Sequence, residues 1–129
     1  MRLRIVADKQ GVIRAAKAAR AFAARCELAE RHADRLALVL EEWLGNVVEH
    51  GGAAPGSRIV IRLDRPDARV RLTMSDAGAA FDPRAAAFQG PNLQRGGGVG
   101  LELVRAWAEI LDYRRRRARN RVVLAVGAP

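Results

Sequence analysis

The spacing of apolar residues changes several times along the chain, and this constrains the fold more than any other feature. Between residues 12 and 48, apolar side chains recur every three or four residues in two successive stretches, as on one face of a helix. Asp8 precedes the first stretch as a possible N-cap, and Gly51 and Gly52 follow the second, where glycine tolerates a left-handed cap. We therefore expect two consecutive amphipathic helices.

Apolar and polar residues alternate before and after these helices, a pattern of half-buried strands. Leu3 and Ile5 alternate with arginines near the N-terminus, and residues 58–63 and 69–74 alternate on either side of turn residues at 65–68. Residues 101–108 have helical spacing. Beyond them, residues 111–113, a basic run at 114–117, a turn at Ala118-Arg119-Asn120 and an apolar run at 122–126 read as a closing hairpin.

This order of elements predicts an α+β fold: a two-layer α/β sandwich with a mostly antiparallel sheet covered on one face by three helices. With 129 residues and neither repeat nor linker, we expect a single domain over residues 1–129. Charged residues break every apolar stretch before the ~18 to 20 residues that cross a bilayer, and no signal-peptide pattern follows Met1. We therefore expect a cytoplasmic protein without a membrane partner.

The charge of the chain is strongly positive, with 23 Lys and Arg against 14 Asp and Glu and a net charge of +9. All but two of these cations are arginines, which make bidentate contacts with phosphate and carboxylate. The excess predicts an acidic partner, although a coding preference for arginine explains it equally well. Aromatic residues make up only 5%, and no DNA-reading or base-stacking motif is present, so we do not expect nucleic acid to be that partner.

Cysteine and histidine are too scarce for thiolate or zinc chemistry. Cys26 is the single cysteine, which excludes an intrachain disulfide, and the chain has two histidines. Candidate chemistry therefore lies with carboxylates, amides and glycines.

Four polar side chains lie along one side of the second expected helix, next to its apolar stripe: Glu42, Asn46, Glu49 and His50. A solvated helix edge would explain the two glutamates, but asparagine favours caps and turns over helix interiors. A carboxylate and an amide one turn apart can hold Mg²⁺ through oxygen, with the carboxylate free to take a proton.

Two glycine-containing segments bound the irregular stretch from residue 76 to residue 100. Asp76 ends a strand and could accept a hydrogen bond from an exocyclic amine, while Gly78 would let a flat ring approach the backbone; a plain strand-ending turn explains the same residues. The glycines at 96–98 and Gly100 precede the third helix, where backbone N–H groups could receive phosphate or form a hinge. Neither a P-loop nor a dinucleotide-binding turn is present.

Taken together and in this order, these segments resemble the motifs of the GHKL (Bergerat-fold) ATPase superfamily. The likeness is greatest to the small serine/threonine kinases that act as bacterial anti-sigma factors. Residues 42–51 resemble the N box, residues 76–83 the G1 box and residues 97–105 the G2 box, and the pairs Tyr113-Arg114 and Asn120-Arg121 lie in the closing hairpin.

The resemblance implies a role for each motif. Asn46 would coordinate Mg²⁺, Asp76 would bind the amine of adenine in ATP, and Gly78 would lie beneath the ring. Glu42 would be the catalytic base that activates a serine of the substrate protein.

The phosphates of ATP would be held at the third helix. The resemblance implies this role for Gly98, Gly100 and Leu101, behind an ATP lid at about residues 83–98. The Ala, Gly and Pro content of that segment predicts that it is mobile without nucleotide.

The resemblance also implies two protein partners, a sigma factor and a STAS-type anti-anti-sigma protein whose serine is phosphorylated, with a homodimer as a further possibility. The chain departs from the family pattern at Gly45, at Glu49, where relatives often carry a basic residue, and at Val123, where many have threonine. The alternative reading is therefore a non-catalytic regulator of the same fold, ATP-sensing or nucleotide-free, that masks a partner by surface contact.

Overall fold

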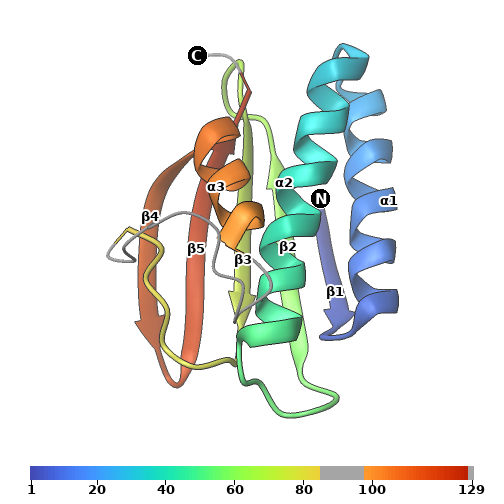
Figure 1. Cartoon of the computed structure of the whole chain (residues 1–129). Coiled ribbons are helices and arrows are strands. Elements are labelled where there is room, and N and C mark those ends of the chain that lie inside the picture. Colours follow the sequence, from blue (N-terminus) through green and yellow to red (C-terminus); the bar gives the residue numbers. More distant parts are fainter. Residues whose placement is uncertain (85–97, 128–129) are drawn as a thin grey trace.

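The computed structural model describes residues 1–84 and 98–127, and in these parts of the chain three helices cover one face of a five-stranded sheet (Figure 1). The elements are β1 (Arg2–Val6), α1 (Lys9–Arg25), α2 (Glu30–His50), β2 (Arg58–Asp64), β3 (Val70–Asp76), α3 (Gly98–Trp107), β4 (Ala108–Arg116) and β5 (Arg119–Val126). This arrangement confirms the expected α+β sandwich.

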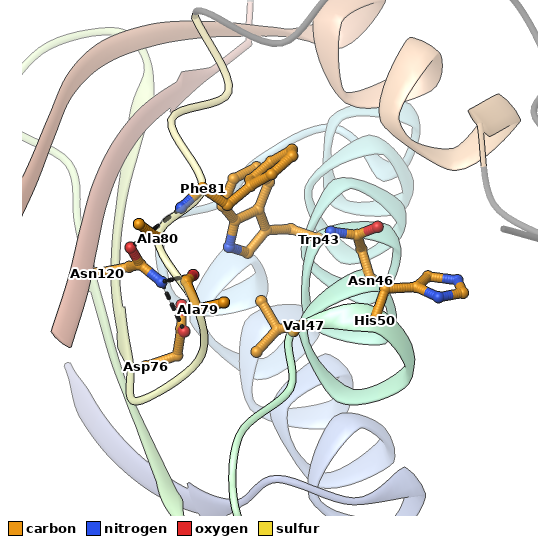
Figure 2. A pocket seen from close by; sticks show the side chains of 10 residues that line it. Trp43, Asn46, Val47, His50, Asp76, Ala79, Ala80, Phe81 and Asn120 are labelled. Atoms are coloured by element: carbon orange, nitrogen blue, oxygen red, sulfur yellow. Dashed lines mark hydrogen bonds between the residues drawn. The ribbon is translucent and has the colours of Figure 1, made fainter. Parts of the chain in front are cut away.

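The sheet has the order β1-β2-β3-β5-β4, and every neighbouring pair of strands is antiparallel. Both expected hairpins form, and they join in the middle of the sheet where β3 pairs with β5. This pairing places Asp76, the last residue of β3, opposite Asn120 near the start of β5 (Figure 2). Two polar residues far apart in sequence thus meet on the helix side of the sheet.

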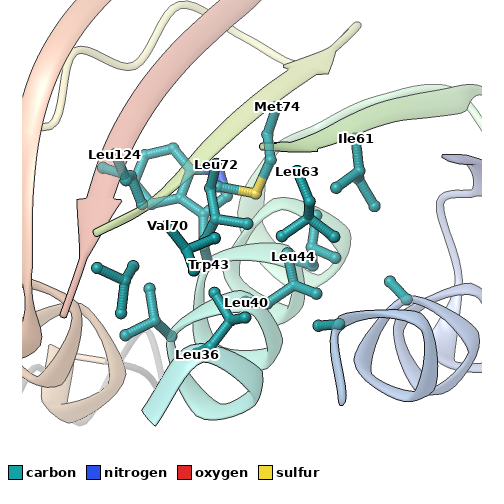
Figure 3. Packing of buried hydrophobic residues seen from close by; sticks show 14 of the residues in the cluster. Leu36, Leu40, Trp43, Leu44, Ile61, Leu63, Val70, Leu72, Met74 and Leu124 are labelled. Atoms are coloured by element: carbon teal, nitrogen blue, oxygen red, sulfur yellow. The ribbon is translucent and has the colours of Figure 1, made fainter. Parts of the chain in front are cut away.

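The core lies between α2 and the centre of the sheet (Figure 3). Burial alternates strictly along β3, so one face of this strand packs against the helices. The side chains in this contact are Leu36, Leu40, Trp43 and Leu44 of α2, Ile61 and Leu63 of β2, Val70, Leu72 and Met74 of β3, and Leu124 of β5. Each fully buried leucine contributes roughly 1.5–3 kcal/mol, so this contact fixes α2 on the sheet.

The N-terminal boundary of α1 is confirmed, because the Asp8 carboxylate accepts a hydrogen bond from Gly11 N at 2.7 Å. The expected end of the third helix is wrong by one residue. The helix ends at Trp107, and Ala108 already pairs with Val126 as the first residue of β4.

The expected turn at residues 118–120 is also displaced. Arg117 and Ala118 form the turn, with φ of 53° and 60°, the left-handed backbone that a tight two-residue hairpin turn requires at both central positions. Glycine or asparagine usually occupies the central positions of such a turn, but here the central residues are arginine and alanine. Asn120 therefore belongs to β5 and not to the turn.

Within the described strands, the face of the sheet away from the helices carries nine arginines, and we call it the arginine face. Because side chains alternate along each strand, the residues paired in register share a face. The arginine face comprises Arg2, Arg4, Arg58, Arg62, Arg71, Arg114, Arg116, Arg119 and Arg121.

Candidate functional site

A pocket of about 160 Å³ lies between the C-terminal half of α2, the loop after β3 and the start of β5 (Figure 2). A cavity of about 150 Å³ holds a benzene molecule, so this pocket has room for one flat ring. Its lining residues are Trp43, Asn46, Val47, His50, Gly51, Asp76, Ala79, Ala80, Phe81 and Asn120. The pocket brings together Asn46 and Asp76, which lie 30 residues apart in the sequence.

Asp76 is the buried carboxylate of this pocket, with 5% of its surface exposed. Its Oδ1 accepts hydrogen bonds from Gly78 N at 2.8 Å and from Asn120 Nδ2 at 3.1 Å. These donors fix the carboxylate group within the wall of the pocket. A carboxylate held in this way can accept a hydrogen bond from an amine of a bound ring.

Asn120 organises the loop that forms the pocket wall, and it is also 5% exposed. Its Nδ2 donates to Ala79 O at 2.8 Å, and its Oδ1 accepts from Tyr113 Oη at 2.5 Å, Arg115 Nη1 at 3.1 Å and Phe81 N at 3.4 Å. The side-chain amide is therefore fully engaged with protein groups, so its role is to position neighbouring groups.

The motifs of the sequence assign no site role to Asn120. The available signal is its spacing, because Asn120 lies two and four residues before Val122 and Leu124 and so falls with them on the inward side of β5. An inward-facing amide needs buried partners, and the acidic residue at the end of β3 is the obvious one.

Gly78 lies beside Asp76 but is not among the residues that line the pocket, and the structure gives a separate reason for a glycine there. A Cβ at this position would lie 2.6 Å from Gly51 O and 2.9 Å from Asp76 Oδ1. In the same contact, Ala79 N donates to Gly51 O at 2.7 Å. The glycine thus allows the loop after β3 to pack against the C-terminal end of α2.

Glu42 and Asn46 lie one turn apart on α2, and the first turn of α3 lies beside Glu42. A Cβ at Gly100 would collide with the carboxylate of Glu42, which is half-buried. Gly98 is the first residue of α3, and the side chain of Leu101 packs in the core with 8% exposed. Leu101 can therefore meet a phosphate only through its backbone N–H. Most of the expected lid, residues 85–97, lies outside the described residues.

Of the remaining members of the α2 polar row, His50 reaches the pocket and Glu49 does not. Glu49 lines a separate groove with Lys9, between α1 and α2, and its side chain is 61% exposed. His50 lines the pocket, but its ring turns away from Asp76 (Figure 2). Val123 pairs with Thr73 and lies on the arginine face, so it does not contribute to the pocket.

The segment that leaves the pocket toward the undescribed residues is held by an ion pair. Arg84 donates from Nε to Asp82 Oδ1 and from Nη2 to Asp82 Oδ2, each at 3.2 Å, and from Nη2 to Tyr113 O at 3.4 Å. The hydrogen bond to Asp82 raises the pKa of the Arg84 guanidinium. This end of the loop is thereby tied to β4.

Within residues 1–84 and 98–127, no three His, Cys, Asp or Glu side chains are placed to hold a metal ion together. The side-chain oxygen of Asn46 nevertheless suits Mg²⁺, which is usually bound by few protein groups together with substrate phosphates. In the same part of the chain, no helix has the length and hydropathy to cross a membrane.

Comparison with known proteins identifies relatives of this chain. Residues 5–126 match the model of the histidine kinase-like ATPase domain. The chain is 37% identical over 97 residues to the serine/threonine-protein kinase BtrW of Bordetella bronchiseptica, a match that covers 69% of this chain and 66% of the relative. The histidine kinase domain from the Erythrobacter litoralis EL346 blue-light-activated histidine kinase matches with 23% identity and a TM-score of 0.48, over 74% of this chain and 44% of that chain.

The chain thus spans slightly less than two thirds of BtrW. The family model, in contrast, covers nearly all of this chain, from β1 to the last residue of β5. The chain belongs to the histidine kinase-like ATPase family.

Proposed function

We propose that the chain is an ATP-dependent serine/threonine protein kinase that acts as an anti-sigma regulatory factor and phosphorylates a STAS-type anti-anti-sigma protein. The observation that carries the proposal is the close approach of Gly100 to Glu42, which sets a carboxylate beside the first turn of α3. Asn46 lies one helical turn further along α2, at the pocket that contains Asp76. The name of BtrW, a serine/threonine-protein kinase, supports the same class of reaction.

ATP fits this arrangement with its base in the Asp76 pocket and its phosphates toward α3. Asp76 accepts from the exocyclic amine of adenine, and Asn120 and Gly78 N hold the carboxylate in place. At the first turn of α3, backbone N–H groups without helical partners favour phosphate oxygens. Asn46 would hold Mg²⁺, which neutralises charge on the phosphates during transfer.

Glu42 supplies the general base, which accepts the serine proton during transfer. As the serine oxygen of the partner bonds to the terminal phosphorus of ATP, the bond from that phosphorus to ADP breaks. The serine proton passes to the carboxylate of Glu42. The half-buried position of Glu42 beside Gly100 suits this role.

The arginine face suits the acidic partner that the net charge predicts. Arginines stand directly opposite one another in three pairs, Arg2 with Arg62, Arg114 with Arg121, and Arg116 with Arg119. Like charges at such positions destabilise a sheet. An acidic protein surface would relieve this repulsion, whereas a second copy of the chain on the same face would increase it, so a homodimer would use another surface.

The test is to incubate the protein with labelled ATP, Mg²⁺ and each STAS protein encoded by the same organism. We expect transfer of label to a serine of one of them. ATP binding without transfer to any STAS protein would instead support the non-catalytic, ATP-sensing regulator. Failure to bind any adenine nucleotide would leave only the nucleotide-free regulator.

A further inference from the structure

The indole nitrogen of Trp43 is a buried donor that the described residues leave unpaired. The side chain is 3% exposed and lines the pocket, yet no group of the described residues accepts a hydrogen bond from Nε1. Some nine in ten buried polar groups have a hydrogen-bond partner, so such an atom at a pocket wall indicates a ligand acceptor.

The donor is held in a fixed direction. The Trp43 ring packs in the core and contacts Phe81, with ring centroids 6.1 Å apart and an interplanar angle of 52°. In Figure 2, the ring extends from α2 across the pocket, and its nitrogen points toward the wall formed by Ala79, Ala80 and Asn120. Rotation of this buried ring would disrupt its packing, so Nε1 stays aimed at the pocket.

A ligand that satisfies this pocket must offer two complementary groups. It needs a donor for the carboxylate of Asp76 and an acceptor for the indole N–H of Trp43. Asn120 satisfies neither need, because its amide is engaged with backbone and side-chain groups of the protein. Adenine has both groups, an exocyclic amine and ring nitrogens with free lone pairs.

We propose that the indole N–H of Trp43 donates a hydrogen bond to a ring nitrogen of adenine and is a specificity determinant of the pocket. This inference rests on the proposed ATP binding and adds a second polar contact to the one made by Asp76. A site built to make a buried hydrogen bond discriminates against ligands that lack the partner, because its own group is then left unpaired.

The first test uses the wild-type chain and calorimetric titration with ATP and with its deaza analogues, in which one ring nitrogen at a time is replaced by C–H. We expect one analogue to bind about 5- to 10-fold more weakly than ATP, the effect of one lost hydrogen bond. Equal affinity for ATP and for every analogue would overturn the proposal without any variant being made.

The second test repeats the series with Trp43→Phe, which keeps an aromatic ring beside Phe81 and removes the N–H together with part of the indole ring, so the comparison between analogues, and not the affinity for ATP alone, reports the hydrogen bond. The variant should bind ATP about 5- to 10-fold more weakly than wild type and should no longer discriminate against the weak analogue. Discrimination that persists in this variant would overturn the role of Trp43. Thermal unfolding of the variant, with and without ATP, reports whether the fold is kept.

Trp107→Phe is the matched control. Trp107 is the last residue of α3, and the Cζ atom of Arg35 lies over its ring, 5.4 Å from the ring centroid. Trp107 is not among the residues that line the pocket. This variant should bind ATP and the analogues as wild type does. Because the chain has two tryptophans, its remaining indole is Trp43, whose fluorescence should change when ADP binds.

The outcomes separate this inference from the proposed function. If wild type binds no adenine nucleotide, both fail together. If wild type binds ATP and Trp43→Phe binds it equally well, the ATP-binding function stands and the role of Trp43 is wrong.

Discussion

Asn120 donates from Nδ2 to Oδ1 of Asp76 at 3.1 Å, across two strands that pair in register although 44 residues separate them. Gly78 N donates to the same oxygen. Among the described residues, both donors use Oδ1, which leaves the second carboxylate oxygen for a ligand. Two properties of the pocket therefore depend on this pair, the direction of the carboxylate and the stability of the loop after β3.

Asp76→Asn should weaken ATP and ADP binding by about 1–3 kcal/mol, because a charge-assisted hydrogen bond becomes a neutral one and an amide donor can face the amine of the base. Calorimetric titration in Mg²⁺ measures the difference. Asp64→Asn, at the end of β2 and away from the pocket, is the control and should bind as wild type does. Equal nucleotide affinity of the two variants would contradict the role of Asp76.

Asn120→Ala should lower the free energy of unfolding by about 1–3 kcal/mol, because it leaves the buried partners of the amide unpaired. Denaturant unfolding measures this loss. Asn46→Ala is the matched comparison, since Asn46 lines the same pocket but is less buried. The free energy of unfolding of this second variant should be within about 0.5 kcal/mol of the wild-type value, and the variant should lose Mg²⁺-dependent ATP binding.

Two glycine substitutions should change stability in opposite directions. Gly78→Ala should destabilise the fold, because the added Cβ would lie 2.6 Å from Gly51 O, a backbone atom that cannot move aside cheaply. Gly45→Ala should stabilise it by about 0.5–1 kcal/mol, because no atom lies within 4 Å of the added Cβ and alanine favours helix interiors. If thermal unfolding shows that both substitutions raise the melting temperature, or that both lower it, one of these packing descriptions is wrong.

The fold could be predicted from the sequence because its local signals agree with its tertiary structure. The two helical stretches, the alternating strands and the Asp8 cap each indicate one element, and hydrophobic burial on one face then requires the sandwich. The end of α3 and the last turn could not be placed. Trp107 and Ala108 both fit a helix, and Arg117 and Ala118 carry no signal for positive φ.

The site residues that belong to a sequence motif could be predicted, whereas those that depend on how two strands pair could not. Asp76, Gly78, Asn46 and Glu42 each stand in a recognisable segment. The partner of Asp76 depends on the register of β3 against β5, which no local pattern specifies, and the unpaired N–H of Trp43 depends on side-chain packing. The side of β5 on which Val123 lies depends in the same way on register, which puts it on the arginine face.

The arginine face leads to a prediction about stability and association. Arg121→Gln removes the like-charge contact with Arg114 and should leave the free energy of unfolding unchanged or raise it by a few tenths of a kcal/mol. The same change should slow association with an acidic partner and reduce its salt dependence. Stopped-flow association at two salt concentrations provides the measurement, and an unchanged rate would exclude this part of the face from the interface.

Glu42→Ala should separate nucleotide binding from phosphoryl transfer. The adenine and Mg²⁺ contacts come from other residues, so ATP affinity should stay within a few-fold of wild type, while serine phosphorylation should fall by at least about 10²-fold, the usual contribution of a general base. Glu41→Ala is a sharp control, because the neighbouring carboxylate lines the groove between α1 and α2 instead of the start of α3. Transfer rates from labelled ATP to the STAS partner should be near wild type for Glu41→Ala. If both variants transfer phosphate at the wild-type rate, the carboxylate beside Gly100 is not the base, and positioning of the serine by α3 and Asn46 must carry the reaction.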